Sequence, residues 1–279
     1  MRRPTFDVLT PSTGEAPVVV EIPHAGLELP SEVLARLVAP ARAIARDADL
    51  HVDELYEDAV DEGATVLVAR TSRYAVDLNR AEDDVDAGVV EGDPRPARPT
   101  ARGLVWSSTT EDEPALERPL SREEYRWRVE TLHRPYHEAL RAILDRKVSR
   151  FGYAILLCAH SMPSVGRNGH VDAGTHRADV VPGTRGRTST HPRVIEAVET
   201  VAKSFGLGVE HDRPYRGGFS TTHYGRPAAK CHAIQIELAR RLYLDEARLL
   251  RVPSGMASTR KLCRAFVARL ASLPSEGLR

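Results

Sequence analysis

The chain has 279 residues, and 39 lysines and arginines balance 39 aspartates and glutamates, so its formal net charge at pH 7 is zero. Proteins dedicated to nucleic acid usually carry a basic surplus, which argues against that class. No stretch approaches the roughly 18 apolar residues of a membrane-spanning helix. The three cysteines are widely spaced, which excludes a disulfide framework. We therefore expect a cytoplasmic protein with neither a nucleic-acid nor a membrane partner.

The first third of the chain alternates short apolar runs with helical patterns. The β-branched runs predict buried strands, and the recurring apolar positions between them predict helices. The predicted strands cover Val18–Ile22, 64–69 and 73–78, and the predicted helices cover 31–40 and the stretch from 47–49 to 63. Strands and helices in this order favour a mixed, largely parallel α/β sheet with helices on both faces.

Residues 81–120 have a different composition, with an acidic run and several prolines, and they predict a long loop or lid insert. A solvated surface excursion is the alternative interpretation. The elements predicted after this loop are a helix from 121 to about 147, a strand over 153–158, a helix over 192–205, a strand over 232–237 and closing helices from about 245. No linker-like Gly/Ser stretch divides the chain, so we expect a single α/β domain over residues 1–279.

Polar side chains stand at the ends of three predicted strands. His24 follows the first strand, His160 follows the strand over 153–158, and Glu237 ends the strand over 232–237. Ligands of open α/β sheets bind beyond the carboxyl ends of the strands, so we expect these side chains to meet. Two histidines and a carboxylate form the ligand set of many hydrolytic zinc sites. The alternative is that each histidine is a hydrogen-bonded structural residue.

Two aspartates at the start of the second predicted helix offer a further carboxylate ligand. Asp49 and Asp53 are one helical turn apart and would share a face, so either could complete the set. His133 and His137 are less suited to a metal, because the zincin pattern requires Glu next to the first His and Arg134 stands there. Capping or packing is the role expected for these two histidines.

Arg73, Asn79 and Arg80 form a second constellation, after the strand over 64–69. An arginine fork matches the geometry of a carboxylate, and an adjacent amide adds a donor. Facing a metal site, this group would hold a small acid by its carboxylate. The sequence contains neither a Gly-x-Ser-x-Gly nucleophile elbow nor a Gly-rich phosphate cradle, which argues against a serine hydrolase and against nucleotide use.

Taken in order, these motifs resemble the N-formylglutamate amidohydrolase family. The matching segments are 22–26, 49–56, 72–80, 134–137, 159–161, 217–227 and 234–238. The resemblance implies a hydrolase-like fold similar to zinc-dependent carboxypeptidases. It also implies hydrolysis of the amide bond of an N-acyl amino acid, with one zinc-like divalent ion as cofactor. In the named activity, which belongs to histidine degradation, N-formyl-L-glutamate gives formate and L-glutamate.

The resemblance also implies roles for individual residues at the metal. His24 and His160 become metal ligands, with Asp53 as the third ligand and Asp49 as the second choice. Glu237 matches the position of the general base that carboxypeptidases carry on a late strand.

The resemblance further implies how the substrate is held. Asn79 and Arg80 are similar to the Asn-Arg pair with which carboxypeptidases bind a substrate carboxylate, and Arg73 or His223 would support a second carboxylate. Two alternatives remain at this stage. One is a peptidase or amidase of the same fold acting on larger cell-wall or peptide substrates, and the other is a non-catalytic binding protein. A lid over a small pocket would favour an amino-acid-sized substrate.

Overall fold

The computed structural model describes residues 4–12, 14–86, 88–92, 102–168 and 170–279, and a six-stranded sheet lies at its centre. The strands are β1 (Phe6–Leu9), β2 (Val18–Ile22), β3 (Thr65–Ala69), β4 (Ala154–Met162), β5 (Val180–Gly183) and β6 (Cys231–Ala239). They lie in the order β1, β3, β2, β4, β6, β5. The four central strands run parallel, and β1 and β5 pair antiparallel at the edges. The predicted mixed, largely parallel sheet is confirmed.

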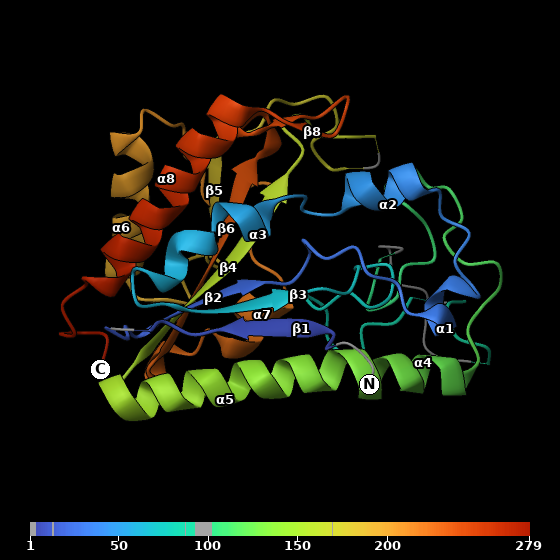
Figure 1. The fold of residues 1–279 in the computed structure, drawn as a ribbon, viewed down its shortest axis with the longest axis horizontal. Helices are drawn as coiled ribbons and strands as arrows, with labels where there is room; N and C mark the ends of the chain where they lie inside the picture. Colours follow the sequence, from blue (N-terminus) through green and yellow to red (C-terminus); the bar gives the residue numbers. More distant parts are fainter. Residues whose placement is uncertain (1–3, 13, 87, 93–101, 169) are drawn as a thin grey trace.

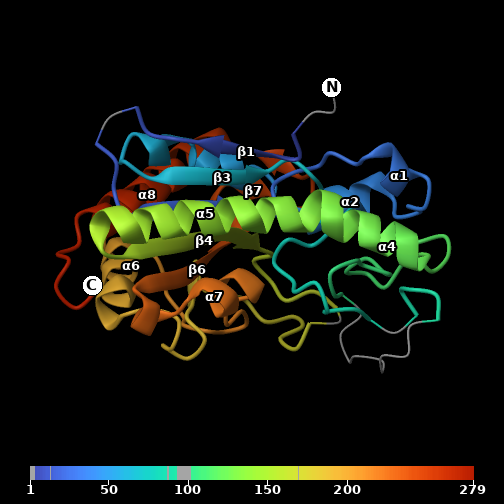
Figure 2. The same ribbon diagram turned by 90° about the horizontal axis from the view of Figure 1, so that it is seen from below.

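Helices cover both faces of the sheet (Figure 1). On one face, α3 (Val52–Leu55), α6 (Pro192–Ser204) and α8 (Pro253–Ala271) pack their apolar side chains against β2, β4 and β6. On the other face lie α5 (Arg134–Phe151) and α7 (Phe219–Tyr224), and Figure 2 shows α5 running along the sheet. All nine residues of β4 are buried, as a central strand covered on both faces requires.

The remaining elements are short or extend those already named. They are α1 (Ser31–Leu34), α2 (Ala41–Asp47), η1 (Glu57–Val60), α4 (Arg122–Arg128), the π-helical turn η2 (Val129–His133), η3 (Pro227–Ala229), η4 (Arg240–Leu242), β7 (Leu244–Asp245) and β8 (Leu250–Arg251). The long helix predicted from Ser121 is confirmed as the run α4–η2–α5. Its capping box is present, because Ser121 Oγ accepts from Glu124 N at 3.1 Å and Glu124 Oε2 accepts from Ser121 N at 2.7 Å.

The helix predicted from residues 47–49 to 63 is wrong as a single element. The chain forms α2 up to Asp47, then a turn, then α3 and η1. The interruption lies at His51, whose φ of 65° is left-handed and incompatible with a continuing helix. Asp49 therefore lies in a turn before α3, and it does not share a helical face with Asp53.

The strand predicted over residues 73–78 is also wrong. This segment folds into turns, with Ala75 N donating to Ser72 O at 2.8 Å. The buried Arg128 donates to the carbonyl oxygens of Tyr74 at 3.2 Å and Ala75 at 2.7 Å. A side chain thus satisfies the backbone groups that a neighbouring strand would otherwise pair.

The end of the chain differs from the helices expected from about residue 245. The strands β7 and β8 first pair antiparallel, and the single helix α8 begins only at Pro253. Pro253 suits the first helical position, because a proline lacks the N–H that would be unpaired there.

The segment over residues 81–120 forms turns and isolated bridges in its described part, which comprises 81–86, 88–92 and 102–120. It is packed rather than fully solvated, since Leu104, Val105 and Leu120 are buried. Trp106 packs against Tyr74 with ring centroids 5.4 Å apart. The segment therefore forms part of the body of the protein, and its function as a lid stays a prediction.

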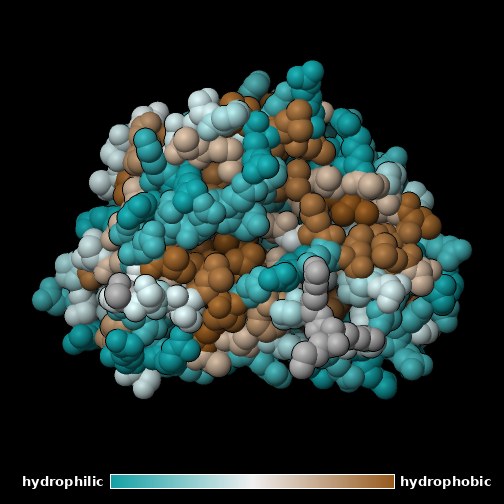
Figure 3. Space-filling view, in the orientation of Figure 1, coloured by the Kyte–Doolittle hydropathy of each residue, from teal (hydrophilic) through white to brown (hydrophobic). Residues whose placement is uncertain are grey.

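Polar side chains cover much of the surface in the orientation of Figure 1, with apolar groups in the centre and around α1 and α2 (Figure 3). Leu27, Leu34 and Val38, in the connection from β2 to α2, are about half exposed. In the part of the chain that the structure describes, no helix is both long and apolar enough to cross a bilayer.

Candidate active site

Three side chains that are distant in sequence meet at the carboxyl ends of the central strands. His24 follows β2, His160 lies near the end of β4, and Asp49 lies in the turn between α2 and α3. The turn is tied to the strand end, because Asp49 N donates to His24 O at 3.0 Å. All three residues are buried, each with 3% exposure.

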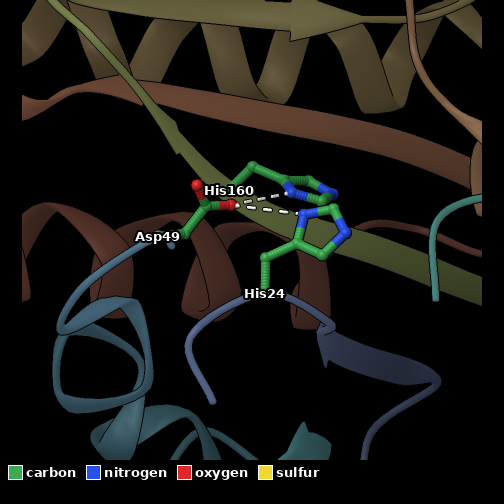
Figure 4. Close-up of side chains that lie close together, drawn as sticks. All are labelled: His24, Asp49 and His160. Carbon is green, nitrogen blue, oxygen red and sulfur yellow. Dashed lines mark hydrogen bonds and ion pairs between the residues drawn. The ribbon is translucent and has the colours of Figure 1, made fainter. Parts of the chain in front are cut away.

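The carboxylate of Asp49 points between the two imidazole rings (Figure 4). Its Oδ2 atom lies 3.1 Å from Nδ1 of His160 and 3.6 Å from Nδ1 of His24. One donor atom of each residue lies within 4.8 Å of the other two. Although burial acts against it, the neighbouring imidazoles of His160 and His24 hold the pKa of Asp49 well below its ordinary value.

This group fits a divalent metal. Two ligands of a tetrahedral zinc ion, with bonds of about 2.0–2.1 Å, lie about 3.3 Å apart. The separations of 3.1 and 3.6 Å in the cluster lie on either side of this value. Two imidazole nitrogens and one carboxylate oxygen suit zinc, and three protein ligands leave a position open, as in catalytic sites.

Each end of the cluster is held by an outer partner. Nε2 of His24 donates to Oδ1 of Asp77 at 2.7 Å, which leaves Nδ1 facing Asp49. Arg240 donates to Oδ1 of Asp49 at 3.1 Å, which leaves Oδ2 for the histidines. Asp77 also accepts from Arg73 at 2.8 Å. Partners of this kind orient metal ligands and are part of the function of such sites.

Glu237 lies next to the cluster, on β6. It is the register partner of His160 on β4, and it is 6% exposed. Its Oε1 atom accepts from Gln235 Nε2 at 3.0 Å. Burial raises the pKa of Glu237 to about 7, against the opposing effect of His160. A carboxylate whose pKa lies near neutrality is suited to general acid–base chemistry.

A cavity of about 690 Å³ opens onto these residues, a size that suits a small molecule. Nine arginines and six carboxylates contribute to its lining in the described part of the chain. The surplus of cationic groups favours an anionic ligand.

Two arginines that were predicted to bind substrate, Arg73 and Arg80, line the cavity. Arg80 is 40% exposed and lies 3.8 Å from Asp84. Arg73 is largely buried, forms an ion pair with Asp77, and lies 4.4 Å over the ring of Trp106. Arg80 is therefore the more accessible of the two for a ligand.

Asn79 also lines the cavity, but protein groups engage its side-chain amide. Its Oδ1 atom accepts from Ser220 N at 3.0 Å, and its Nδ2 atom faces Nε2 of His160 at 3.3 Å and Oε1 of Gln235 at 3.4 Å. The geometry fits a residue that orients His160 and the start of α7. His223 does not line the cavity; it contacts Arg141 at 2.8 Å.

The structure does not bring the preferred third ligand to the cluster. Asp53 is exposed on α3, and the second choice, Asp49, joins the histidines. Asp77 and Arg240, the outer partners of the cluster, were not identified from the sequence. Asp77 stood within the 72–80 motif, which was a usable signal, whereas nothing in the sequence links Arg240 to Asp49, 191 residues away.

A model of the N-formylglutamate amidohydrolase family matches residues 16–244 of this chain. The chain belongs to the N-formylglutamate amidohydrolase family. It is 38% identical over 244 residues to an N-formylglutamate deformylase of Pseudomonas putida, covering 86% of each chain. It is 34% identical over 270 residues to an N-formylglutamate deformylase of Pseudomonas aeruginosa, covering 95% of this chain and 96% of the relative.

A solved structure leads to the same family. The crystal structure of N-formylglutamate amidohydrolase from Ralstonia eutropha JMP134 superposes with a TM-score of 0.87 and 31% identity, over 96% of this chain and 97% of that chain. The resemblance that the motifs indicated is thus confirmed. The prediction of a hydrolase that acts on carbon–nitrogen amide bonds is confirmed by membership of this amidohydrolase family.

Proposed function

We propose that this member of the N-formylglutamate amidohydrolase family hydrolyses N-formyl-L-glutamate to formate and L-glutamate with the help of one zinc-like divalent ion. The observation that carries the proposal is the cluster of His24, Asp49 and His160 beside Glu237, at the floor of an arginine-lined cavity. The names of the Pseudomonas relatives support this substrate.

In this proposal, His24 and His160 hold the ion through Nδ1, and Asp49 holds it through Oδ2. When bound there, a divalent ion polarises the acyl oxygen and lowers the pKa of water toward ~7. Asp77 and Arg240 keep the ligand atoms aimed at one point. Asp53 then has no role in the site.

Glu237 is the proposed general base. It accepts the proton of the attacking water through its carboxylate and passes that proton to the leaving amino group of glutamate. Gln235 donates to Oε1 of Glu237, which fixes the carboxylate and leaves Oε2 for the proton. The pKa of about 7 lets the same group act as base and then as acid near neutral pH.

Two arginines are proposed to recognise the two carboxylates of the substrate. Arg80 binds the α-carboxylate, which follows from its exposure in the cavity. Arg216 binds the side-chain carboxylate. It is exposed at the cavity, and its guanidinium makes no hydrogen bond or ion pair with any described residue. Arg73 is neutralised by Asp77 and acts on the site through that carboxylate.

The cavity wall favours an amino-acid-sized substrate over a peptide. Trp106 and Thr110, from the 81–120 segment, both line the cavity. Asp47 accepts from Thr110 N at 3.0 Å and from Arg167 at 3.1 Å, which ties this segment to the opposite connection after β4. A wall held in this way restricts the length of the substrate.

The test is formate release by the purified, zinc-loaded protein from N-formyl-L-glutamate. Matched substrates are its α-carboxamide, N-formyl-L-glutamine, and N-formylated peptides with an internal glutamate. We expect the free diacid to be cleaved best and each amide to be cleaved at least tenfold less well, since each lacks one charge-assisted pair. Equal or faster cleavage of the peptides would support the peptidase alternative, and no cleavage of any substrate would refute the proposed function.

A further inference from the structure

His133 and His137 lie one helical turn apart, at the junction of η2 and α5, and the proposed reaction does not use them. His137 Nε2 lies 2.9 Å from the carbonyl oxygen of Leu78. His133 Nε2 lies 2.9 Å from the carbonyl oxygen of Arg80. The two rings thus reach the carbonyl groups of the two residues that flank Asn79.

The chemistry of these contacts defines which ring nitrogen carries the proton. A carbonyl oxygen can only accept, so Nε2 of each ring must donate. Nδ1 of His137 then accepts from the hydroxyl of Tyr224 at 2.9 Å. Burial lowers the pKa of both histidines, to about 3 for His137, so both rings are neutral at pH 7. Each ring therefore holds one fixed N–H toward the 78–80 backbone.

The surrounding packing keeps both rings in place. Their centroids are 4.3 Å apart, and the ring of Phe219 lies 5.1 Å from His137 and 6.1 Å from His133. The π-helical turn Val129–His133 ends two residues before Pro135, whose missing N–H disturbs the regular helical ladder there. Such π-helical turns occur frequently at functional sites.

The backbone of Asn79 makes two further hydrogen bonds. Its N–H donates to Oδ1 of Asp77 at 2.9 Å, and its carbonyl oxygen accepts from Phe219 N at 3.2 Å. Together with the contacts of the two histidines, these hydrogen bonds fix the peptide groups 78–79, 79–80 and 80–81. Arg80 leaves this fixed backbone to line the cavity.

We propose that His133 and His137 are positioning residues that hold the backbone of residues 78–80 and thereby place the Arg80 guanidinium for the substrate α-carboxylate. This inference rests on the proposed function, in which Arg80 binds that carboxylate. A histidine that only stabilised the fold would change the amount of active protein, and it would affect all substrates equally.

The experiment compares kcat/KM for N-formyl-L-glutamate with that for its α-carboxamide, in zinc-loaded variants. His137→Ala and His133→Ala remove one N–H donor each. His137→Gln keeps an amide N–H close to the position of Nε2. Glu138→Ala is the matched control, because Glu138 is the exposed neighbour of His137 on α5 and does not line the cavity. Thermal unfolding of each variant records whether it folds.

In both alanine variants, we expect the acid-to-amide ratio to fall about tenfold or more, mainly through KM for the acid, because misplaced binding groups lose a factor of this order. His137→Gln should restore the ratio to within about threefold, and Glu138→Ala should leave it unchanged. A wild-type ratio in a folded alanine variant overturns the inference. If His137→Ala does not fold, His133→Ala alone tests the inference by the same criterion. Absence of wild-type activity toward N-formyl-L-glutamate would instead refute the proposed function.

Discussion

Asp77 Oδ1 lies 2.7 Å from Nε2 of His24, while Nδ1 of the same ring faces Asp49 at 3.6 Å. The ring is thus held at both nitrogens, and Asp77 determines which of them is left for a metal. Although burial opposes it, the charges of Arg73 and His24 hold the pKa of Asp77 well below its ordinary value. Asp77 is therefore an ionised acceptor that aligns His24.

We expect Asp77→Asn to weaken zinc binding about 10–100-fold, because outer carboxylates that orient a metal-bound histidine contribute this much. Competition with a chromophoric chelator measures the affinity. Asp58→Asn is a suitable control, since Asp58 pairs with Arg260 on the surface of η1. Unchanged zinc affinity in Asp77→Asn would show that His24 is oriented by other contacts.

Asp49 and Asp53 form a natural pair of test positions for the third ligand. Asp49→Asn should lose zinc at stoichiometric concentrations, because two remaining histidines rarely retain it. Asp53→Asn should bind about one ion per chain, as the wild type does. Metal analysis after gel filtration measures the zinc content of both variants. Loss of zinc in Asp53→Asn with full occupancy in Asp49→Asn would reverse the assignment.

The strands that carry the site could be predicted from the sequence for a clear physical reason. β4 and β6 are covered on both faces, so each is a nearly continuous apolar run with a polar residue near its end. Because the two strands are parallel neighbours, His160 and Glu237 become register partners. Ligands bind at the carboxyl ends of parallel strands, so His160 and Glu237 are both expected at the binding site.

The choice between Asp49 and Asp53 could not be made from the sequence. The apolar pattern after residue 47 is periodic, and only the left-handed backbone of His51 ends the helix. That conformation places Asp49 in a turn tied to His24 O. The contact of Arg240 with Asp49 was equally hidden, because it joins segments that only the folded sheet brings together.

Glu237→Gln tests the general base. The variant keeps the shape and cannot take a proton, so kcat should fall on the order of a hundredfold or more, with zinc still bound. In the wild type, the base acts when deprotonated, so kcat/KM should rise with pH and level off. Burial raises the pKa of Glu237 to about 7, and a bound cation lowers it, so the acid limb should lie at or below about pH 7. A near-wild-type kcat in the variant would remove Glu237 from the mechanism.

Arg80→Ala tests recognition of the substrate carboxylate. Loss of a charge-assisted pair should lower kcat/KM for N-formyl-L-glutamate about ten- to a hundredfold. Conversion of the α-carboxylate to an amide should cost the wild type a similar factor, and the two losses should not add. Steady-state kinetics on the four combinations measures the coupling. Fully additive losses would mean that Arg80 and the α-carboxylate do not interact.

Glu21 provides a test of stability against pH. It is fully buried in β2, where Oε1 accepts from Ser220 Oγ at 2.8 Å and Oε2 has no hydrogen-bond partner among the described residues. Burial raises its pKa above the ordinary value of 4.5. Above that value the unfolded chain releases a proton that the folded protein retains, so the stability contributed by this group falls as pH rises.

Glu21→Gln cannot titrate, so its free energy of unfolding relative to the wild type should rise with pH by up to about 1.4 kcal/mol per unit above ~4.5, until Glu21 ionises in the folded protein. Urea unfolding at several pH values between about 5 and 8 gives the difference. A difference that stays constant over this range would show that Glu21 is ionised in the folded protein throughout.

The central claim is that His24, Asp49 and His160 together hold the ion that hydrolysis requires. Anomalous diffraction from crystals of the zinc-loaded protein, recorded on both sides of the zinc absorption edge, tests it most directly. The account predicts one dominant zinc peak about 2.0–2.2 Å from Nδ1 of His24, Oδ2 of Asp49 and Nδ1 of His160. A zinc peak elsewhere in the molecule, or none in this cluster, would contradict it.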